Sequence, residues 1–130
     1  NIFIAGADIK LASVRAGNVI GGGYTAEDLL IPNFLRAIDA DETLSIRSPN
    51  AIGPWQHVLE PLAGYLMLTE KLVTDGANYA EAWNFCPEEA DAKPVSWIVE
   101  HLCNNIPSAK WELEGTPQPH EAGLLKLDSF

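Results

Sequence analysis

The hydrophobic positions begin with a run that predicts a buried strand. From Leu11 to Val19 the residues are mostly small or β-branched, and only Arg15 and Asn18 are clearly polar. Such a run is typical of a strand covered on both faces, as in a parallel sheet. Gly21, Gly22 and Gly23 should end it, because glycine accepts positive φ and close backbone approach.

Three later segments place apolar residues at helical spacing. They are Leu30–Ala40, Leu59–Thr74 and Pro94–Asn105. In the first, the spacing predicts a buried face made of Ile31, Phe34, Leu35 and Ile38. In the second, the predicted face is Leu62, Leu66, Thr69, Leu72 and Val73. Gly76 follows that helix and is a candidate C-cap.

Short alternating runs between the helices predict further strands at Leu44–Arg47, Ala82–Phe85 and Lys110–Glu114. The Asn, Gly and Pro residues of Asn50–Pro54 predict a loop, which continues through Trp55–His57. Strands and helices thus alternate along the chain, which indicates a mixed α/β fold. The 130 residues are enough for one core but not two, so we expect a single domain over residues 1–130.

Charge and cysteine content exclude several kinds of partner. The formal net charge is −10 and the isoelectric point is about 4.5, so the chain repels phosphate backbones and anionic lipid surfaces. We therefore expect no nucleic-acid or membrane partner. Cys86 and Cys103 lack zinc-ligand spacing, which predicts no metal site and two reduced thiols in a cytoplasmic protein. The opening NIFIAG segment fits neither a signal peptide nor a membrane span.

Five segments, taken in order, carry a resemblance to a known family. They are Ala12–Gly23 (ASVRAGNVIGGG), LIPNFLRAI, Ile46–Pro61 (IRSPNAIGPWQHVLEP), WNFCPEEADAKPVSWIVEHL and PHEAGLLKLD. Their order, spacing and identities resemble CDP-glucose 4,6-dehydratases, which are extended short-chain dehydrogenases/reductases. The resemblance runs from Leu11 to Asp128. It implies the C-terminal, substrate-binding portion of such an enzyme, without the dinucleotide-binding Rossmann half.

The resemblance implies a set of substrate-binding residues, which are Asn18, Leu30, Ile31, Pro32, Ile46, Arg47, Trp55, His57 and Glu121. Asn18 would lie near the sugar or diphosphate, and residues 30–32 would flank the nucleotide base. Residues 46 and 47 would lie beside the ribose or base, and Glu121 would reach the ribose hydroxyls. Residues 55–57 would form the wall that orients the nucleotide. For Trp55 and His57 a purely structural role, as a packed aromatic and a core-edge histidine, is equally open.

Several residues depart from the family pattern. Gly53 stands where the family usually has an arginine that clamps phosphate, and Leu29 replaces a second arginine. Asn33 replaces an aspartate, and Tyr24-Thr25 replaces Asp-Trp. Losing two arginines from an acidic chain should weaken diphosphate binding considerably. Restoring the first by Gly53→Arg is therefore expected to raise the affinity for CDP.

The residues needed for catalysis in this family are not found in the sequence. The chain has no Gly-x-x-Gly-x-x-Gly loop and no Tyr-x-x-x-Lys pair. We assign no catalytic residue and expect no cofactor in this chain, since the resemblance implies NAD only for the complete family enzyme. His57 with Glu60, or His120 with Glu121, could act as an acid/base couple in an unrelated small enzyme, which is a distant alternative.

Two main hypotheses for function remain. The first is a nucleotide-sugar-binding portion of a dehydratase, a lyase of CDP-hexoses that is not catalytically competent alone. The second is a stand-alone, non-catalytic binding or assembly module that has kept the scaffold and lost its phosphate clamp. In either case a homodimer is expected, because the strand at Leu11–Val19 would lack its usual cover and a second copy can supply it.

Overall fold

The computed structural model describes residues 8–23 and 25–115. The helices are α1 (Leu30–Asp39), α2 (Leu59–Asp75) and α3 (Val95–Asn105), with short 3-10 turns at Gly76–Tyr79 and Glu89–Asp91. The strands are β1 (Ser13–Ala16), β2 (Asn18–Ile20), β3 (Leu44–Ile46), β4 (Ile52–Gly53), β5 (Trp55–His57), β6 (Ala82–Phe85), β7 (Lys93–Pro94) and β8 (Trp111–Leu113). The expected mixed α/β fold is confirmed.

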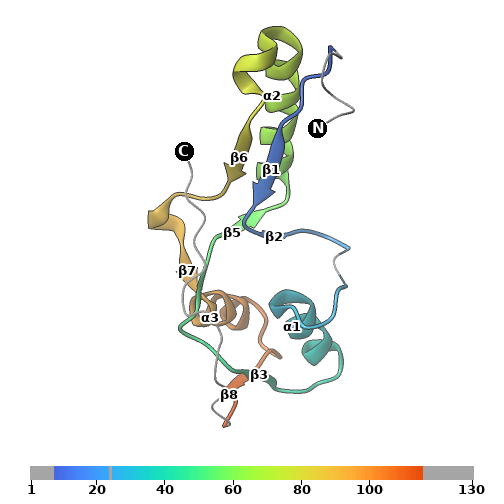
Figure 1. Ribbon diagram of the computed structural model, residues 1–130. Coiled ribbons are helices and arrows are strands. Elements are labelled where there is room, and N and C mark those ends of the chain that lie inside the picture. Colours follow the sequence, from blue (N-terminus) through green and yellow to red (C-terminus); the bar gives the residue numbers. More distant parts are fainter. Residues whose placement is uncertain (1–7, 24, 116–130) are drawn as a thin grey trace.

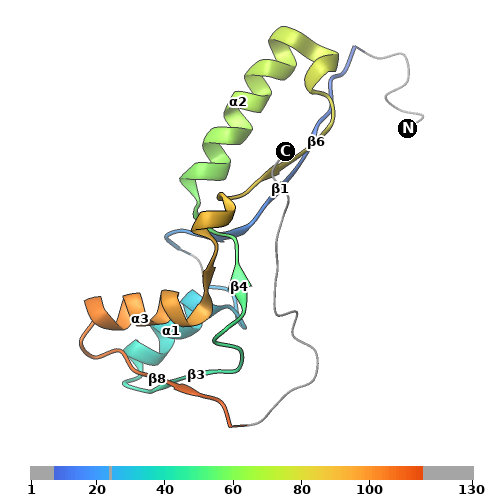
Figure 2. The ribbon, with the colours of Figure 1, turned by 90° about the vertical axis from the view of Figure 1, so that its left-hand side faces the viewer.

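The elements form two regions joined by a narrow middle (Figures 1 and 2). One region holds α2 beside the parallel pair β1–β6, and the other holds α1 and α3 over the parallel pair β3–β8. Between them lie the parallel pair β2–β5 and the antiparallel pair β4–β7. That both regions form one domain over 1–130 stays a prediction, and the unfolding experiment below tests it.

The strand predicted at Leu11–Val19 is broken at Gly17, where the chain changes partners. The Gly17 N–H donates to the Phe85 carbonyl at 3.2 Å, whereas the Asn18 N–H donates to the Pro54 carbonyl at 2.8 Å. A Cβ atom on Gly17 would lie 2.5 Å from that Pro54 oxygen, so only glycine fits the crossing. Because of this change, residues 55–57 are not loop as predicted but form β5, which pairs with β2.

In the chain by itself this strand lacks the cover on both faces that its composition predicts, in agreement with the expectation that its usual cover is missing. Residues 13–15 are all exposed, and the Val14 side chain is 40% accessible. Pairing with β6 covers only one edge of β1, and within the described residues no further strand lies along its other edge. The turn after β2 follows expectation, since Gly23 has a φ of 75°.

The main core joins α1 and α3 to the β3–β8 pair. Its buried members are Phe34, Leu44, Ile46, Val99 and Ala109, of which Phe34 and Val99 are fully buried. On α1 the buried side also includes Leu30, Ala37 and Ile38, whereas Leu35 is 48% exposed. The predicted face of this helix was therefore partly wrong. The packed side of the helix differs from the predicted one because it contacts both β3 and α3 in the core.

The face of helix α2 that packs on the β1–β6 pair is not the predicted one. Pro61 and Leu68 are buried, and Tyr65 meets the Phe85 ring edge-to-face at 5.2 Å. Most of the predicted face is exposed instead, with Leu66 at 73% and Val73 at 82%. Apolar residues lie on more than one side of this helix, so the spacing alone did not identify the packed side. Gly76 ends the helix with a φ of 53°, in agreement with the predicted cap.

We expect Phe34→Ala to destabilise the protein by about 3–4 kcal/mol, because it removes a fully buried ring from the core. Leu35→Ala, the next residue on the same helix, should cost less than about 1 kcal/mol since its side chain is half exposed. Urea unfolding followed by tryptophan fluorescence and by circular dichroism measures both. Equal losses would contradict the observed face of α1, and two separate transitions would contradict a single domain.

Candidate functional site

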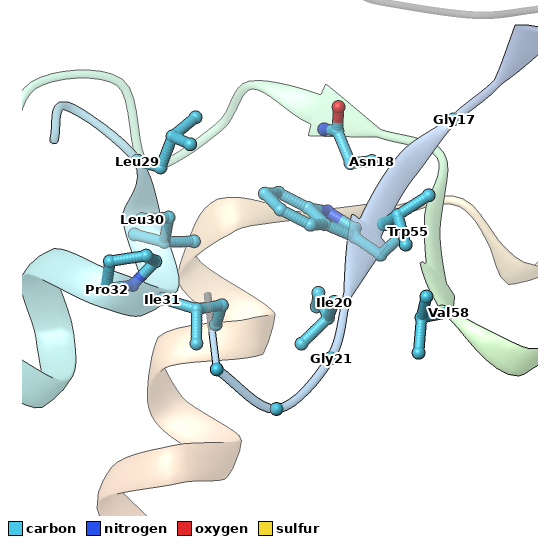
Figure 3. Close-up of a pocket in the computed structure, with 13 residues that line it drawn as sticks. Gly17, Asn18, Ile20, Gly21, Leu29, Leu30, Ile31, Pro32, Trp55 and Val58 are labelled. Atoms are coloured by element: carbon cyan, nitrogen blue, oxygen red, sulfur yellow. The ribbon is translucent and has the colours of Figure 1, made fainter. Parts of the chain in front are cut away.

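A cavity of about 510 Å³ lies between the β2–β5 pair and the start of α1. Leu30, Ile31 and Pro32 form one wall, and Asn18, Trp55 and Val58 face them from the other side (Figure 3). The turn Gly21–Gly23 closes one end. Segments distant in the sequence thus converge on one concave surface.

The register of the β2–β5 pair places the two polar side chains of this cavity. Asn18 is the register partner of Trp55, and register partners in a parallel pair lie on the same face. The Trp55 Nε1–H donates to the Lys93 carbonyl at 2.9 Å, which fixes the indole. Its aromatic ring therefore contributes apolar surface to the cavity, while its one donor is already used.

The wall from α1 is held by an arginine that lies outside the cavity. Arg36 donates to the carbonyls of Thr25 and Ala26, both at 3.2 Å, and to Asn33 Oδ1 at 2.6 Å. These bonds tie the segment before the helix to the helix itself. The position of Leu30–Pro32 therefore depends on Arg36, whose guanidinium is committed to the scaffold.

The chemical character of the cavity is apolar with one hydrogen-bonding group. None of the described residues that line it is charged. Two of them have polar groups in their side chains, Asn18 and Trp55, and the indole N–H of Trp55 is already bonded to the Lys93 carbonyl. An amide can both donate and accept. Such a cavity suits an uncharged ring with hydroxyl or amide groups better than a phosphate.

A second cavity, of about 650 Å³, adjoins the first at Leu30 and is polar. Ile46 and Arg47 line it together with Asp28, Asn33, Ser45, Ser48 and Glu114. The Arg47 Nε–H donates to Glu114 Oε2 at 2.9 Å, an ion pair in which both side chains keep some solvent exposure. A ligand that reached both cavities would have an uncharged end in the first and a polar portion in the second.

The structure groups the sequence-predicted site residues in two sets and leaves two outside them. Asn18, Ile31, Pro32 and Trp55 line the first cavity, Ile46 and Arg47 the second, and Leu30 both. His57 lines neither cavity and its Nδ1 accepts the Leu59 N–H at 3.3 Å where α2 begins. Glu121, and His120 of the alternative acid/base couple, lie outside the described residues.

Gly53 lines neither cavity, but it lies directly against two residues of the first one. It is buried, and a Cβ atom on it would lie 2.6 Å from Asn18 Nδ2 and 3.1 Å from Trp55 Cε2. The lack of a side chain at position 53 is what leaves room for the Asn18 amide beside the indole. The gain in CDP affinity expected for Gly53→Arg stays a prediction, and in this structure the new side chain must first displace the Asn18 amide. Nothing in a single sequence marks this contact.

Other chemistry is sparse in the part of the chain that the structure describes. Residues 8–23 and 25–115 contain no cluster of three or more His, Cys, Asp or Glu that could hold a metal ion. Within the described residues neither Cys86 nor Cys103 forms a disulfide, and burial raises the pKa of Cys103. Of the described helices, none is long and apolar enough to cross a membrane.

The chain is similar in sequence to a CDP-glucose 4,6-dehydratase of Salmonella typhimurium, with 51% identity over 121 residues. The match covers 92% of this chain and 34% of that enzyme, so the chain spans about a third of its relative's length. No protein-family model matches the chain.

Solved structures agree on the fold. A UDP-glucuronic acid 4-epimerase from Bacillus cereus, in complex with UDP-glucuronic acid and NAD, superposes with a TM-score of 0.72 at 16% identity, over 98% of this chain and 39% of the epimerase. TunA, an NAD-dependent NDP-hexosamine 5,6-dehydratase of tunicamycin biosynthesis, gives 0.64 at 20% identity, over 92% of this chain and 36% of TunA. The chain is therefore similar in sequence to about a third of a CDP-glucose 4,6-dehydratase, and it has the fold of the matched portion of these solved sugar-nucleotide enzymes.

Proposed function

We propose that this chain is the C-terminal, nucleotide-sugar-binding portion of a CDP-glucose 4,6-dehydratase-like lyase, and that it catalyses no reaction alone. The observation that carries the proposal is the first cavity. It brings together Asn18, Leu30–Pro32 and Trp55, which are residues that the family resemblance implies for substrate binding. A nucleotide-activated hexose is the ligand class, and a CDP-hexose is the expected member.

The contacts available in the two cavities suggest how such a ligand is held. Leu30, Ile31, Pro32 and the Trp55 ring offer apolar surface to a planar base or a sugar ring. The Asn18 amide offers N–H donors and a carbonyl acceptor to a hydroxyl or a base edge. The diphosphate would meet no charged side chain among the described residues of the first cavity, and the net charge of −10 opposes it. Binding should therefore depend mainly on the uncharged parts of the ligand.

The described residues do not fit a dinucleotide cofactor. A pyrophosphate is normally held where a glycine-rich turn leads directly into a helix N-terminus. Here the Gly21–Gly23 turn is followed by residues 24–29 before α1 begins, and the cavity beside it supplies no charged group from the described residues. The sequence also lacks the Tyr-x-x-x-Lys pair of the family. We therefore place nicotinamide chemistry in another portion of the complete family enzyme.

A second candidate is a non-catalytic binding or assembly module that has kept the scaffold. The pairing of Arg47 with Glu114 favours it, since the arginine in the second cavity already has a counterion. Both candidates bind the same class of ligand, and both are compatible with a cytoplasmic protein, since the described cysteines form no disulfide.

We expect CDP-glucose to bind the isolated chain with a saturable heat in calorimetry, and NAD and NADP to give none. Asn18→Ala should weaken CDP-glucose binding about tenfold, because it removes the polar side chain of the first cavity. Asn78→Ala, the same substitution on an exposed turn after α2, is the matched control and should change nothing. Absence of CDP-glucose binding, or micromolar binding of NAD, would overturn the proposal.

A second experiment tests the contact between Gly53 and Asn18. Gly53→Ala should weaken CDP-glucose binding severalfold, because its Cβ occupies the space of the Asn18 amide. Gly22→Ala is the control, since a Cβ there meets no atom within 4 Å. Gly53→Arg is compared with Gly53→Ala, because both variants carry a Cβ atom at this position. The difference between their CDP-glucose affinities then measures the effect of the rest of the arginine side chain. Any gain from it should fall as salt is added, and unchanged binding in Gly53→Ala would show that Asn18 does not face the ligand.

We also propose that the chain forms a homodimer through its exposed apolar surface. Along the first strand this surface contains Leu11 and Val14, and on α2 it contains Leu59, Leu62, Leu66, Met67 and Val73. Apolar area in water costs roughly 25 cal/mol per Å², and two-fold pairing is the commonest way to cover it. The strong negative charge opposes larger, unspecific aggregates.

Light scattering at several concentrations should give a mass near twice 14.1 kDa. Leu66→Glu should shift the protein toward the monomer, because it places a charge in the middle of the exposed face of α2. Leu35→Glu is the matched control, on a half-exposed leucine of α1 outside that face. A folded species of 14.1 kDa at all concentrations would exclude the dimer.

A further inference from the structure

Arg47 and Glu114 face each other because of the β3–β8 register. The two strands run parallel with Ile46 opposite Leu113, and the Glu114 N–H donates to the Ile46 carbonyl at 2.9 Å. The next residues along both strands are therefore Arg47 and Glu114, brought to the same place by the backbone. Their Nε···Oε2 distance of 2.9 Å is that of a charge-assisted hydrogen bond.

This ion pair lies on the wall of the second cavity, next to the proposed ligand site. Both residues line that cavity, which shares Leu30 with the first one. The Arg47 side chain is 56% exposed and that of Glu114 is 29% exposed, so solvent and ligands can reach the guanidinium. The chain has three arginines, and Arg47 is the one that lines either cavity. Arg36 is bonded to the scaffold, and Arg15 lies on β1.

We propose that Glu114 is a specificity-determining residue that occupies Arg47 and so lowers the affinity of the site for the phosphates of its ligand. The inference rests on the proposed function, because it assigns a role within the same site. A phosphate and the Glu114 carboxylate are both anions that bind a guanidinium. When one of them is paired with Arg47, less of the positive charge is left to attract the other. A ligand phosphate must therefore compete with Glu114, whereas a nucleoside or a sugar hydroxyl need not.

The alternative is that the pair merely braces the ends of β3 and β8. The backbone ladder already joins these strands, and partly exposed ion pairs contribute only about 0–1 kcal/mol to folding. Removal of the Glu114 charge should therefore leave the chain folded. The two roles predict different effects on ligand affinity. If the ion pair only stabilises the strand ends, its loss should change the affinities for phosphorylated and unphosphorylated ligands equally.

The test compares Glu114→Gln with Glu112→Gln, using CDP and cytidine as probes in calorimetry. Glu112 lies on the same strand, is exposed and loses the same charge, so it controls for the general electrostatic field. We expect Glu114→Gln to raise the affinity for CDP about tenfold and Glu112→Gln less than twofold. Cytidine should bind equally to all three proteins. Equal effects of the two variants on CDP would overturn the proposal.

A second variant keeps the proposal falsifiable if Glu114→Gln fails to fold. Arg47→Gln in the original chain should change CDP affinity less than twofold, because Glu114 already holds that guanidinium. A tenfold loss would show that Arg47 binds phosphate freely, and the proposal would be wrong. Failure of the proposed function is recognised separately, since CDP-glucose and cytidine would then bind none of these proteins.

Discussion

The arrangement of the site depends on the crossing of two backbone segments at Gly17. The Cα of this residue lies against the Pro54 carbonyl so closely that no side chain fits between them. The N–H groups on either side of the crossing bond to different strands, Gly17 to Phe85 and Asn18 to Pro54. The first bond keeps β1 with the α2 region. The second sets β2 beside β5 and so places Asn18 opposite Trp55.

Electrostatics then limits what this site can hold. The chain has eight basic residues against eighteen acidic ones, and its three arginines are divided between scaffold, surface and one ion pair. Arg36 stabilises the loop before α1, and Arg47 is neutralised by Glu114. The second cavity therefore has more hydrogen-bonding side chains than the first, but neither cavity has an arginine without a counterion. The proposed recognition of a nucleotide sugar in such a site would rely on its rings and hydroxyls.

The exposed apolar surface of α2 is a second consequence of the fold. Pro61, Tyr65 and Leu68 cover the β1–β6 pair, while Leu62 and Leu66 face solvent. A parallel pair with a helix on it and a free edge is seldom stable alone, because parallel strands are normally covered on both faces. The proposed dimer meets this requirement by covering the surface with a second copy.

The sequence by itself determined the three helices and several of the strands. Helical spacing located α1, α2 and α3 to within a residue at each end, and alternation located β6 at Ala82–Phe85. These features depend on residues near each other in the chain, such as Gly76 after α2, so local pattern is sufficient to find them. The segments RAGNVIGGG and LIPNFLRAI likewise pointed to the residues that line the first cavity.

The tertiary structure alone decided which partners these elements take. The change of strand partner at Gly17, the packed face of α2 and the space that Gly53 leaves for Asn18 all arise from contacts between distant residues. The same is true of the pairing of Arg47 with Glu114, which are 67 positions apart. Hydrophobic spacing reports that a helix has an apolar side but not which of two such sides is covered. A glycine in the sequence likewise reports freedom of the backbone but not the neighbour that needs the space, because that neighbour is fixed only when the chain has folded.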